Sequence, residues 1–94
     1  MGAQGTATID FGSTPVSEAS IAVTGQGSIG SSSFAEAFLQ DNSTGDNDAA
    51  AHKALAFLAK CYCDTLIAGT GFTIRVLMTD GSATGTFKVN WVWN

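Results

Sequence analysis

The feature that most constrains the fold is a pair of alternating apolar segments near the carboxyl end. In 71–79 (GFTIRVLMT) every second residue is large and apolar, and the same period recurs in 85–93 (GTFKVNWVW). A period of two places the apolar side chains on one face of a β-strand. Strands with a single apolar face are typical of antiparallel sheets that cover one core. The two segments therefore predict a mainly β fold.

A hairpin signal, DGSA at 80–83, separates these two segments. A two-residue turn would pair Ile74 with Phe87, and a four-residue loop would pair Ile74 with Val89. Both registers keep the two apolar sets on one face, whereas a slip of one residue would split them. We therefore expect the two segments to form a C-terminal hairpin at the centre of the core.

Two segments near the amino end alternate in the same way, TATIDFG at 6–12 and EASIAVTG at 18–25. The connection between them holds the only proline, which is typical of a turn. With 94 residues, the chain can form one domain, 1–94, which we expect to be a compact antiparallel β-sandwich or a small barrel. The predicted core comprises Ile9, Phe11, Ile21, Val23, Phe72, Ile74, Val76, Phe87, Val89, Trp91 and Trp93.

The middle of the chain is ambiguous between helix and strand. In 33–40, Ser33 and Glu36 have the spacing of a helix capping box, but Ala35, Ala37 and Leu39 alternate as in a strand. Segment 49–60 is rich in Ala and Leu, which favours one short helix near 49–58, and the chain is more typical of a strand from Lys60 onward.

Charge and hydropathy limit the partners of this chain. Only 13% of the residues are charged, the net charge is −4, and the four cations form no basic stripe. Nucleic-acid binding through phosphate neutralisation is therefore not expected. The sequence shows neither a signal peptide nor an apolar run that could span a membrane, so we expect synthesis and folding in a cytoplasm. A weakly charged surface on so small a domain favours association with other proteins.

The stretch GQGSIG at 25–30 matches the G-x-G-x-x-G fingerprint of dinucleotide-binding turns, and Asp46 follows at about the required distance. That fingerprint needs a helix directly after the glycines and a second buried parallel strand that ends at the acid. No apolar run precedes Asp46, and the strand before the glycines alternates. We therefore interpret the glycines as a turn at a strand end, and we expect no cofactor.

No arrangement of residues predicts catalysis. Cys61 or Cys63 with His52 could form a thiol–imidazole pair, but no third orienting group is evident, and a surface histidine beside a loop is the favoured interpretation. The acids Asp41, Asp46 and Asp48 could bind a hard cation, but a solvated loop is favoured because the remaining ligand positions are missing. We expect a protein that is not an enzyme and that holds no metal.

Cys61 and Cys63 flank one residue, so in a strand both sulfur atoms face the same way. Their Cβ atoms would then lie roughly 6–7 Å apart, too far for a disulfide between them. Two reduced, half-buried thiols are the favoured interpretation. The alternative is an intersubunit cross-link through Cys61 and Cys63 once the protein meets an oxidising medium.

Four segments considered as a set resemble a known group of proteins: GTATIDFGS, ASIAVTGQGSI, GTGFTIRV and GTFKVNWVWN, at 5–13, 19–29, 69–76 and 85–94. In that order they are similar to a widespread group of small virion proteins from tailed bacteriophages of Proteobacteria. The Ala-rich middle with its Cys-Tyr-Cys pair departs from the group. The resemblance implies a β-rich component of the capsid or the head–tail region, and it assigns no site residues.

The resemblance and the neutral surface together lead to one expected function. We expect a capsid decoration (cement) protein that binds the major capsid protein and copies of itself, as a homotrimer whose edge strands pair around a threefold axis. Its expected location is the virion, assembled in the host cytoplasm. Two alternatives stay open, a receptor- or glycan-binding module of a tail or fibre and a head–tail or neck component.

Overall fold

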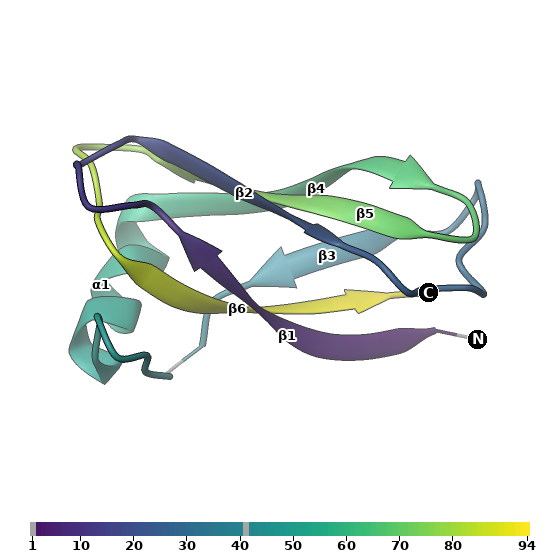
Figure 1. The fold of residues 1–94 in the computed structure, drawn as a ribbon, viewed down its shortest axis with the longest axis horizontal. Helices are drawn as coiled ribbons and strands as arrows, with labels where there is room; N and C mark the ends of the chain where they lie inside the picture. Colours follow the sequence, from purple (N-terminus) through teal and green to yellow (C-terminus); the bar gives the residue numbers. More distant parts are fainter. Residues whose placement is uncertain (1, 41) are drawn as a thin grey trace.

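The computed structural model describes residues 2–40 and 42–94, and they form two antiparallel sheets of three strands packed face to face (Figure 1). The mainly β prediction and the sandwich are thus confirmed, and the sheets do not close into a barrel. One sheet has the order β1–β6–β3 and the other the order β2–β5–β4. The elements are β1 (Ala3–Asp10), β2 (Glu18–Val23), β3 (Ala35–Phe38), α1 (Ala49–Leu58), β4 (Ala59–Ile67), β5 (Gly71–Met78) and β6 (Thr86–Trp93).

The predicted C-terminal hairpin of 71–79 and 85–93 is wrong, because β5 and β6 lie in different sheets. The connection between them crosses from one sheet to the other, and there Ala83 forms a β-bridge with Val16 of the β1–β2 connection. Each C-terminal strand pairs instead with an N-terminal strand. The alternation of apolar residues determines which face of a strand is buried, and two strands that face each other across a core satisfy it as well as two neighbours do.

The register of the pairs explains why these partners fit. In β2–β5, Ile21 lies opposite Ile74, and in β1–β6, Ile9 lies opposite Phe87. Each sheet thus brings its apolar side chains to one face, and the two faces meet at Phe72, whose ring lies edge-on to a tryptophan of the other sheet with centroids 5.6 Å apart. Burial of this shared apolar surface is the main stabilising contribution.

The predicted core is confirmed, with Ile21 half-buried and every other member buried. The tryptophans of β6 therefore belong to the core and do not project into water. Sequence reasoning missed four buried side chains, which come from the loop after β2, from β3 and from α1: Ile29, Ala37, His52 and Leu55.

The ambiguous middle segments resolve into a strand followed by a helix. In 33–40 the chain forms β3, and the Ser33 hydroxyl accepts a hydrogen bond from Gly30 N in a turn instead of capping a helix. The helix predicted near 49–58 is confirmed as α1. It begins at Asp48, whose carboxylate accepts a hydrogen bond from Ala51 N at 2.9 Å, the geometry of an N-cap.

Candidate interaction surface

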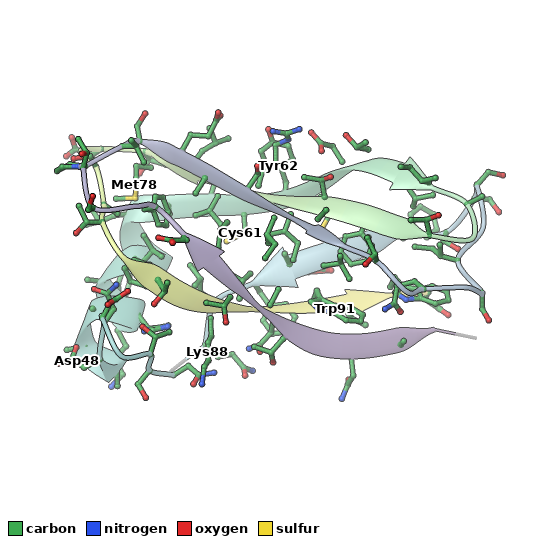
Figure 2. The ribbon with its side chains drawn as sticks, viewed as in Figure 1. Asp48, Cys61, Tyr62, Met78, Lys88 and Trp91 are labelled. Atoms are coloured by element: carbon green, nitrogen blue, oxygen red, sulfur yellow. The ribbon has the colours of Figure 1, made fainter. Side chains whose placement is uncertain are left out.

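The outer face of the β2–β5–β4 sheet carries charge. Glu18, Lys60, Asp64 and Arg75 alternate with residues of the core, and Tyr62 points outward among them (Figure 2). Arg75 Nε lies 2.7 Å from Asp64 Oδ2, and this hydrogen bond raises the pKa of Arg75. The face therefore has the character of an ordinary solvated surface.

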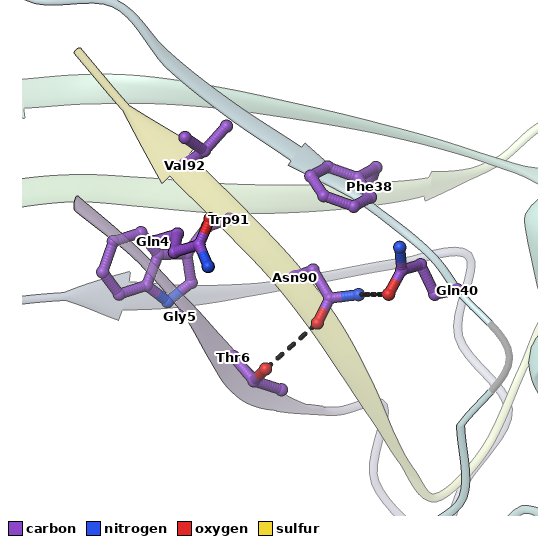
Figure 3. A pocket seen from close by; sticks show the side chains of 8 residues that line it. All are labelled: Gln4, Gly5, Thr6, Phe38, Gln40, Asn90, Trp91 and Val92. Carbon is purple, nitrogen blue, oxygen red and sulfur yellow. Dashed lines mark hydrogen bonds between the residues drawn. The ribbon is translucent and has the colours of Figure 1, made fainter. Parts of the chain in front are cut away.

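The outer face of the β1–β6–β3 sheet has a different composition at its centre. An uncharged group of side chains, here called the Asn90 patch, lines a shallow hollow there (Figure 3). Charges border this group on the same sheet face, since Glu36 of β3 lies opposite Val92 and Lys88 of β6 lies opposite Thr8. The Asn90 patch consists of Gln4, Thr6, Phe38, Gln40, Asn90 and Val92.

Hydrogen bonds hold the polar members of the Asn90 patch in place. The Thr6 hydroxyl donates to Asn90 Oδ1 at 3.0 Å, and Asn90 Nδ2 donates to Gln40 Oε1 at 2.9 Å. This chain of three side chains runs across the sheet from β1 past β6 to the segment after β3 (Figure 3). Each group orients the next, so these exposed side chains lose less conformational freedom when a partner binds than unbonded ones would.

Apolar side chains surround these polar groups. Phe38 and Val92 stay 38% and 36% exposed, and Phe34, four residues before Phe38, is 82% exposed. Phe34 is held in position because its N–H donates to Asn94 O and its carbonyl accepts from Asn94 N, both at 2.9 Å. Alternation places Phe34 on the same face as Phe38. Exposed aromatic rings beside neutral hydrogen-bonding groups are typical of protein–protein interfaces.

The sequence contains a signal for this surface that the core prediction did not use. If Ala35, Ala37 and Leu39 face the core, then the residues between them face solvent, and two of these are Phe34 and Phe38. Aromatic residues on the solvent side of a strand indicate a contact surface, whereas the aromatic residues of β6 indicate a core.

The structure places Cys61 (Figure 2) and Cys63 in β4, and both side chains pack against the core. Both thiols are free and half-buried, as the favoured interpretation predicts. Burial raises the pKa of Cys61, and it raises that of Cys63 to about 11, with smaller contributions from nearby negative charge. Such thiols are slow nucleophiles near neutral pH. The intersubunit cross-link stays a prediction.

His52 is fully buried, so the interpretation as a surface histidine is wrong. Its Nε2 accepts a hydrogen bond from Lys88 N at 3.0 Å, and its Nδ1 lies 2.9 Å from the carbonyl oxygen of Asp48. This arrangement assigns the proton of the neutral ring to Nδ1. Since both ring nitrogens are engaged by backbone groups, the ring serves packing and not proton transfer to a thiol.

The loop acids also have structural partners. Asp46 Oδ2 accepts from Thr86 N at 3.0 Å, and Asp48 caps α1. Asp41 lies outside the described residues. Among the residues that the structure describes, no group of three or more acidic, histidine or cysteine side chains is placed to hold a metal ion.

The glycine-rich stretch at 25–30 forms a turn at the end of β2, as interpreted from the sequence. Gly25 has a φ of 77°, and the element that follows is the strand β3, not the helix that a dinucleotide-binding turn requires. Gln26 within the turn accepts a hydrogen bond from the Trp93 indole at 2.9 Å. The turn therefore satisfies a buried donor of the core.

Comparison of the chain with protein-family models, with curated proteins and with solved structures found no match. Among the described residues, no helix has the length and apolar character needed to cross a membrane.

Proposed function

We propose that this protein is a virion structural protein of a tailed bacteriophage, a decoration protein that binds the major capsid protein as a small homo-oligomer. The sequence resemblance supports the virion role. The observation that carries the binding role is the Asn90 patch, whose uncharged side chains bond one another, on the same sheet face as the exposed Phe34. The surface contains fixed hydrogen-bonding groups and apolar rings, which suit a protein partner.

A shell offers the same binding site many times over. A patch of this size would give modest affinity for one site, but an oligomer that engages several neighbouring capsid subunits gains avidity without any further contact. The neutral composition also fits, because binding through apolar and hydrogen-bonding groups depends little on ionic strength. A homotrimer is the oligomer expected from the sequence.

The test is rebinding of the purified protein to phage particles that lack it. We expect saturable binding in hundreds of copies and greater resistance of the decorated particles to heat. Phe34→Ser should weaken binding strongly. Phe57→Ser is the matched control, because Phe57 is 87% exposed but lies on α1 and does not line the Asn90 patch, and it should bind as the wild type does. Equal binding by both variants, or no binding by the wild type, would refute the proposal.

The same patch also suits a second role, glycan binding at a tail or fibre. Amide groups that bond one another beside an exposed ring, here Gln40, Asn90 and Phe38, are groups that can meet the hydroxyls and the apolar face of a sugar. Binding of the isolated protein to host glycans would favour this role over shell decoration. A count of about a dozen copies or fewer per particle would favour a tail or neck position over the shell.

A further inference from the structure

In the β1–β6–β3 sheet, the side of β6 that faces β3 and the outer side of β1 differ in how many of their backbone N–H and C=O groups have hydrogen-bonding partners. Phe34 and Asn94 exchange two hydrogen bonds, so the even-numbered residues of β6 direct their N–H and C=O groups toward β3. The odd-numbered residues face β1, as the bond from Phe11 N to Gly85 O also shows. In β1 the odd-numbered residues therefore face β6, and the even-numbered ones face away from it.

The side of β6 that faces β3 has hydrogen-bonding partners along most of its length. The short strand β3 reaches only to Asn90, and beyond it the side chains of the 44–52 segment take the place of a strand. Lys88 N donates to His52, and Thr86 N donates to Asp46. Asn47 Nδ2 donates to the carbonyl of Thr86 at 2.8 Å. Side chains thus take the place of a neighbouring strand at Thr86 and at the Lys88 N–H.

Among the described residues, no strand or side chain forms hydrogen bonds to the outer edge of β1 in this way. Among the residues that the structure describes, β1 pairs with β6 alone. The residues that direct backbone groups to this edge are all exposed, and they are Gln4, Thr6, Thr8 and Asp10. Eight residues pair with β6 without a break in register, and the strand contains neither Pro nor Lys, the usual devices that protect an edge. An edge of this kind is a template for another extended strand.

We infer that β1 pairs antiparallel with β1 of a second copy of this chain, about a twofold axis at Ala7. The strand has one charge, Asp10 at its end. Parallel pairing would set the two Asp10 carboxylates side by side, whereas antiparallel pairing puts them at opposite ends of the ribbon. The inference deepens the homo-oligomer of the proposed function and rests on that part alone, so it can hold even if capsid binding fails.

The symmetry and the direction of the free groups select the register. The even-numbered residues of one copy must form hydrogen-bonded pairs with the even-numbered residues of the other. Only a twofold axis that passes at Ala7 pairs all four even-numbered residues of β1 with one another. It places Thr6 opposite Thr8 of the second copy and Gln4 opposite Asp10, so that an amide meets a carboxylate. An axis one residue earlier or later would place either Asp10 or Gln4 opposite a glycine that lies outside β1.

The resulting sheet has six strands in the order β3–β6–β1 followed by β1–β6–β3 of the second copy. Both Asn90 patches then lie on one face of a continuous sheet, which gives a dimer two equivalent contact surfaces for repeated sites. This twofold pairing differs from the threefold pairing of edge strands expected from the sequence, and the oligomeric state distinguishes the two.

The first test is the solution mass of the purified chain and of two proline variants. Thr8→Pro removes an N–H that faces the free edge of β1 and leaves the bonds to β6 intact. Ser20→Pro is the matched control, because Ser20 is likewise exposed and, since Met78 N donates to Ser17 O, its N–H faces the free edge of β2. We expect twice the 9.6 kDa chain mass for the wild type and for Ser20→Pro. Thr8→Pro should raise the dimer dissociation constant roughly tenfold or more.

A second variant tests the register without relying on proline. In the proposed register, position 7 of one copy lies opposite position 7 of the other as a non-hydrogen-bonded pair, with about 4.5 Å between the two Cα atoms. The variant Ala7→Cys should therefore be able to form a disulfide between the two copies. Oxidation should give a dimer, and peptide mapping should identify a disulfide that joins position 7 of one copy to position 7 of the other. A wild type that is monomeric or trimeric, or a dimer that forms no such link and tolerates Thr8→Pro, would overturn the inference. Capsid binding plays no part in either readout.

Discussion

The imidazole of His52 stabilises the fold by joining α1 to β6. It is fully buried, and its two nitrogens meet backbone groups of Asp48 and Lys88 while its ring lies 5.1 Å from the ring of Phe87. A buried backbone donor that loses its partner costs more free energy than the net value of the bond. His52 therefore contributes more to stability than its size alone would indicate.

We predict that His52→Leu lowers the free energy of unfolding by about 2–4 kcal/mol, because it keeps the apolar volume but leaves Lys88 N unpaired. Denaturant titration measures the change. Phe57→Leu on the same helix is the control, and since its ring is 87% exposed it should stay within about 0.5 kcal/mol of the wild type. Equal losses in the two variants would contradict this role for His52.

The thiol of Cys63 gives the protein a pH dependence in the alkaline range. Its pKa is raised from the ordinary value of 9.0 to about 11, chiefly by burial. Between these values the unfolded chain binds fewer protons than the folded one, so the free energy of unfolding falls as the pH rises from 9 to 11. Cys63→Ala should reduce this fall, as denaturant titration at several pH values would show.

The same shift governs the reactivity of the thiol. Reaction of Cys63 with a disulfide reagent should be slow near neutral pH and should accelerate only as the pH approaches 11, because the thiolate is the nucleophile. Rapid, complete labelling of Cys63 in the folded protein at neutral pH would contradict the buried setting described for it.

Among the elements, the 44–52 segment shows how a loop and a helix can substitute for a strand. Asp46 and Asn47 bond the start of β6, and this contact needs Gly85 to be small, because a Cβ there would lie 2.9 Å from Asp46 Cβ. Gly85 also has a φ of 79°, which L side chains rarely adopt. Backbone conformation and close approach thus both require glycine at this position.

We predict that alanine substitutions separate these two effects. Gly12 has a φ of 86° but open space around it, so Gly12→Ala should cost only the conformational strain, about 1 kcal/mol. Gly85→Ala should cost at least about 1 kcal/mol more, because Asp46 must also move. Thermal or denaturant unfolding of the two variants gives the comparison, and equal costs would show that the loop adapts freely.

Alternation and propensity predicted most of the elements but not their partners. The period of two identified β1, β2, β5 and β6, the Ala-rich composition identified α1, and the core followed from both. The sequence could not assign strand partners, because apolar faces meet equally well within one sheet and across two. It also could not reveal the Asn90 patch in full, since Gln40 and Asn90 come together only once β3 and β6 are paired.

For the molecule as a whole, the sandwich brings the two ends of the chain together. Ala3 lies opposite Trp93 in the β1–β6 pair, so β1 begins beside the end of β6 (Figure 1). The only consecutive strands that pair within one sheet, among the described residues, are β4 and β5, through the tight turn at 68–70. The β5–β6 connection, by contrast, joins the two sheets and sets no register within either of them.

This topology makes a prediction that the expected hairpin does not share. A short glycine-rich linker should join 94 to 2 without strain, because the strand ends are already neighbours. Opened between Asp80 and Gly81, in the sheet-crossing connection, such a permuted chain should fold with modest loss of stability, since β5 keeps β2 and β6 keeps β1. Opened between Ala68 and Gly69, the same permuted chain should be less stable, because that turn sets the register of β4 with β5. Denaturant unfolding ranks the two chains. The reverse order would mean that the connection after β5 and not the turn before it specifies strand pairing, as a C-terminal hairpin would require.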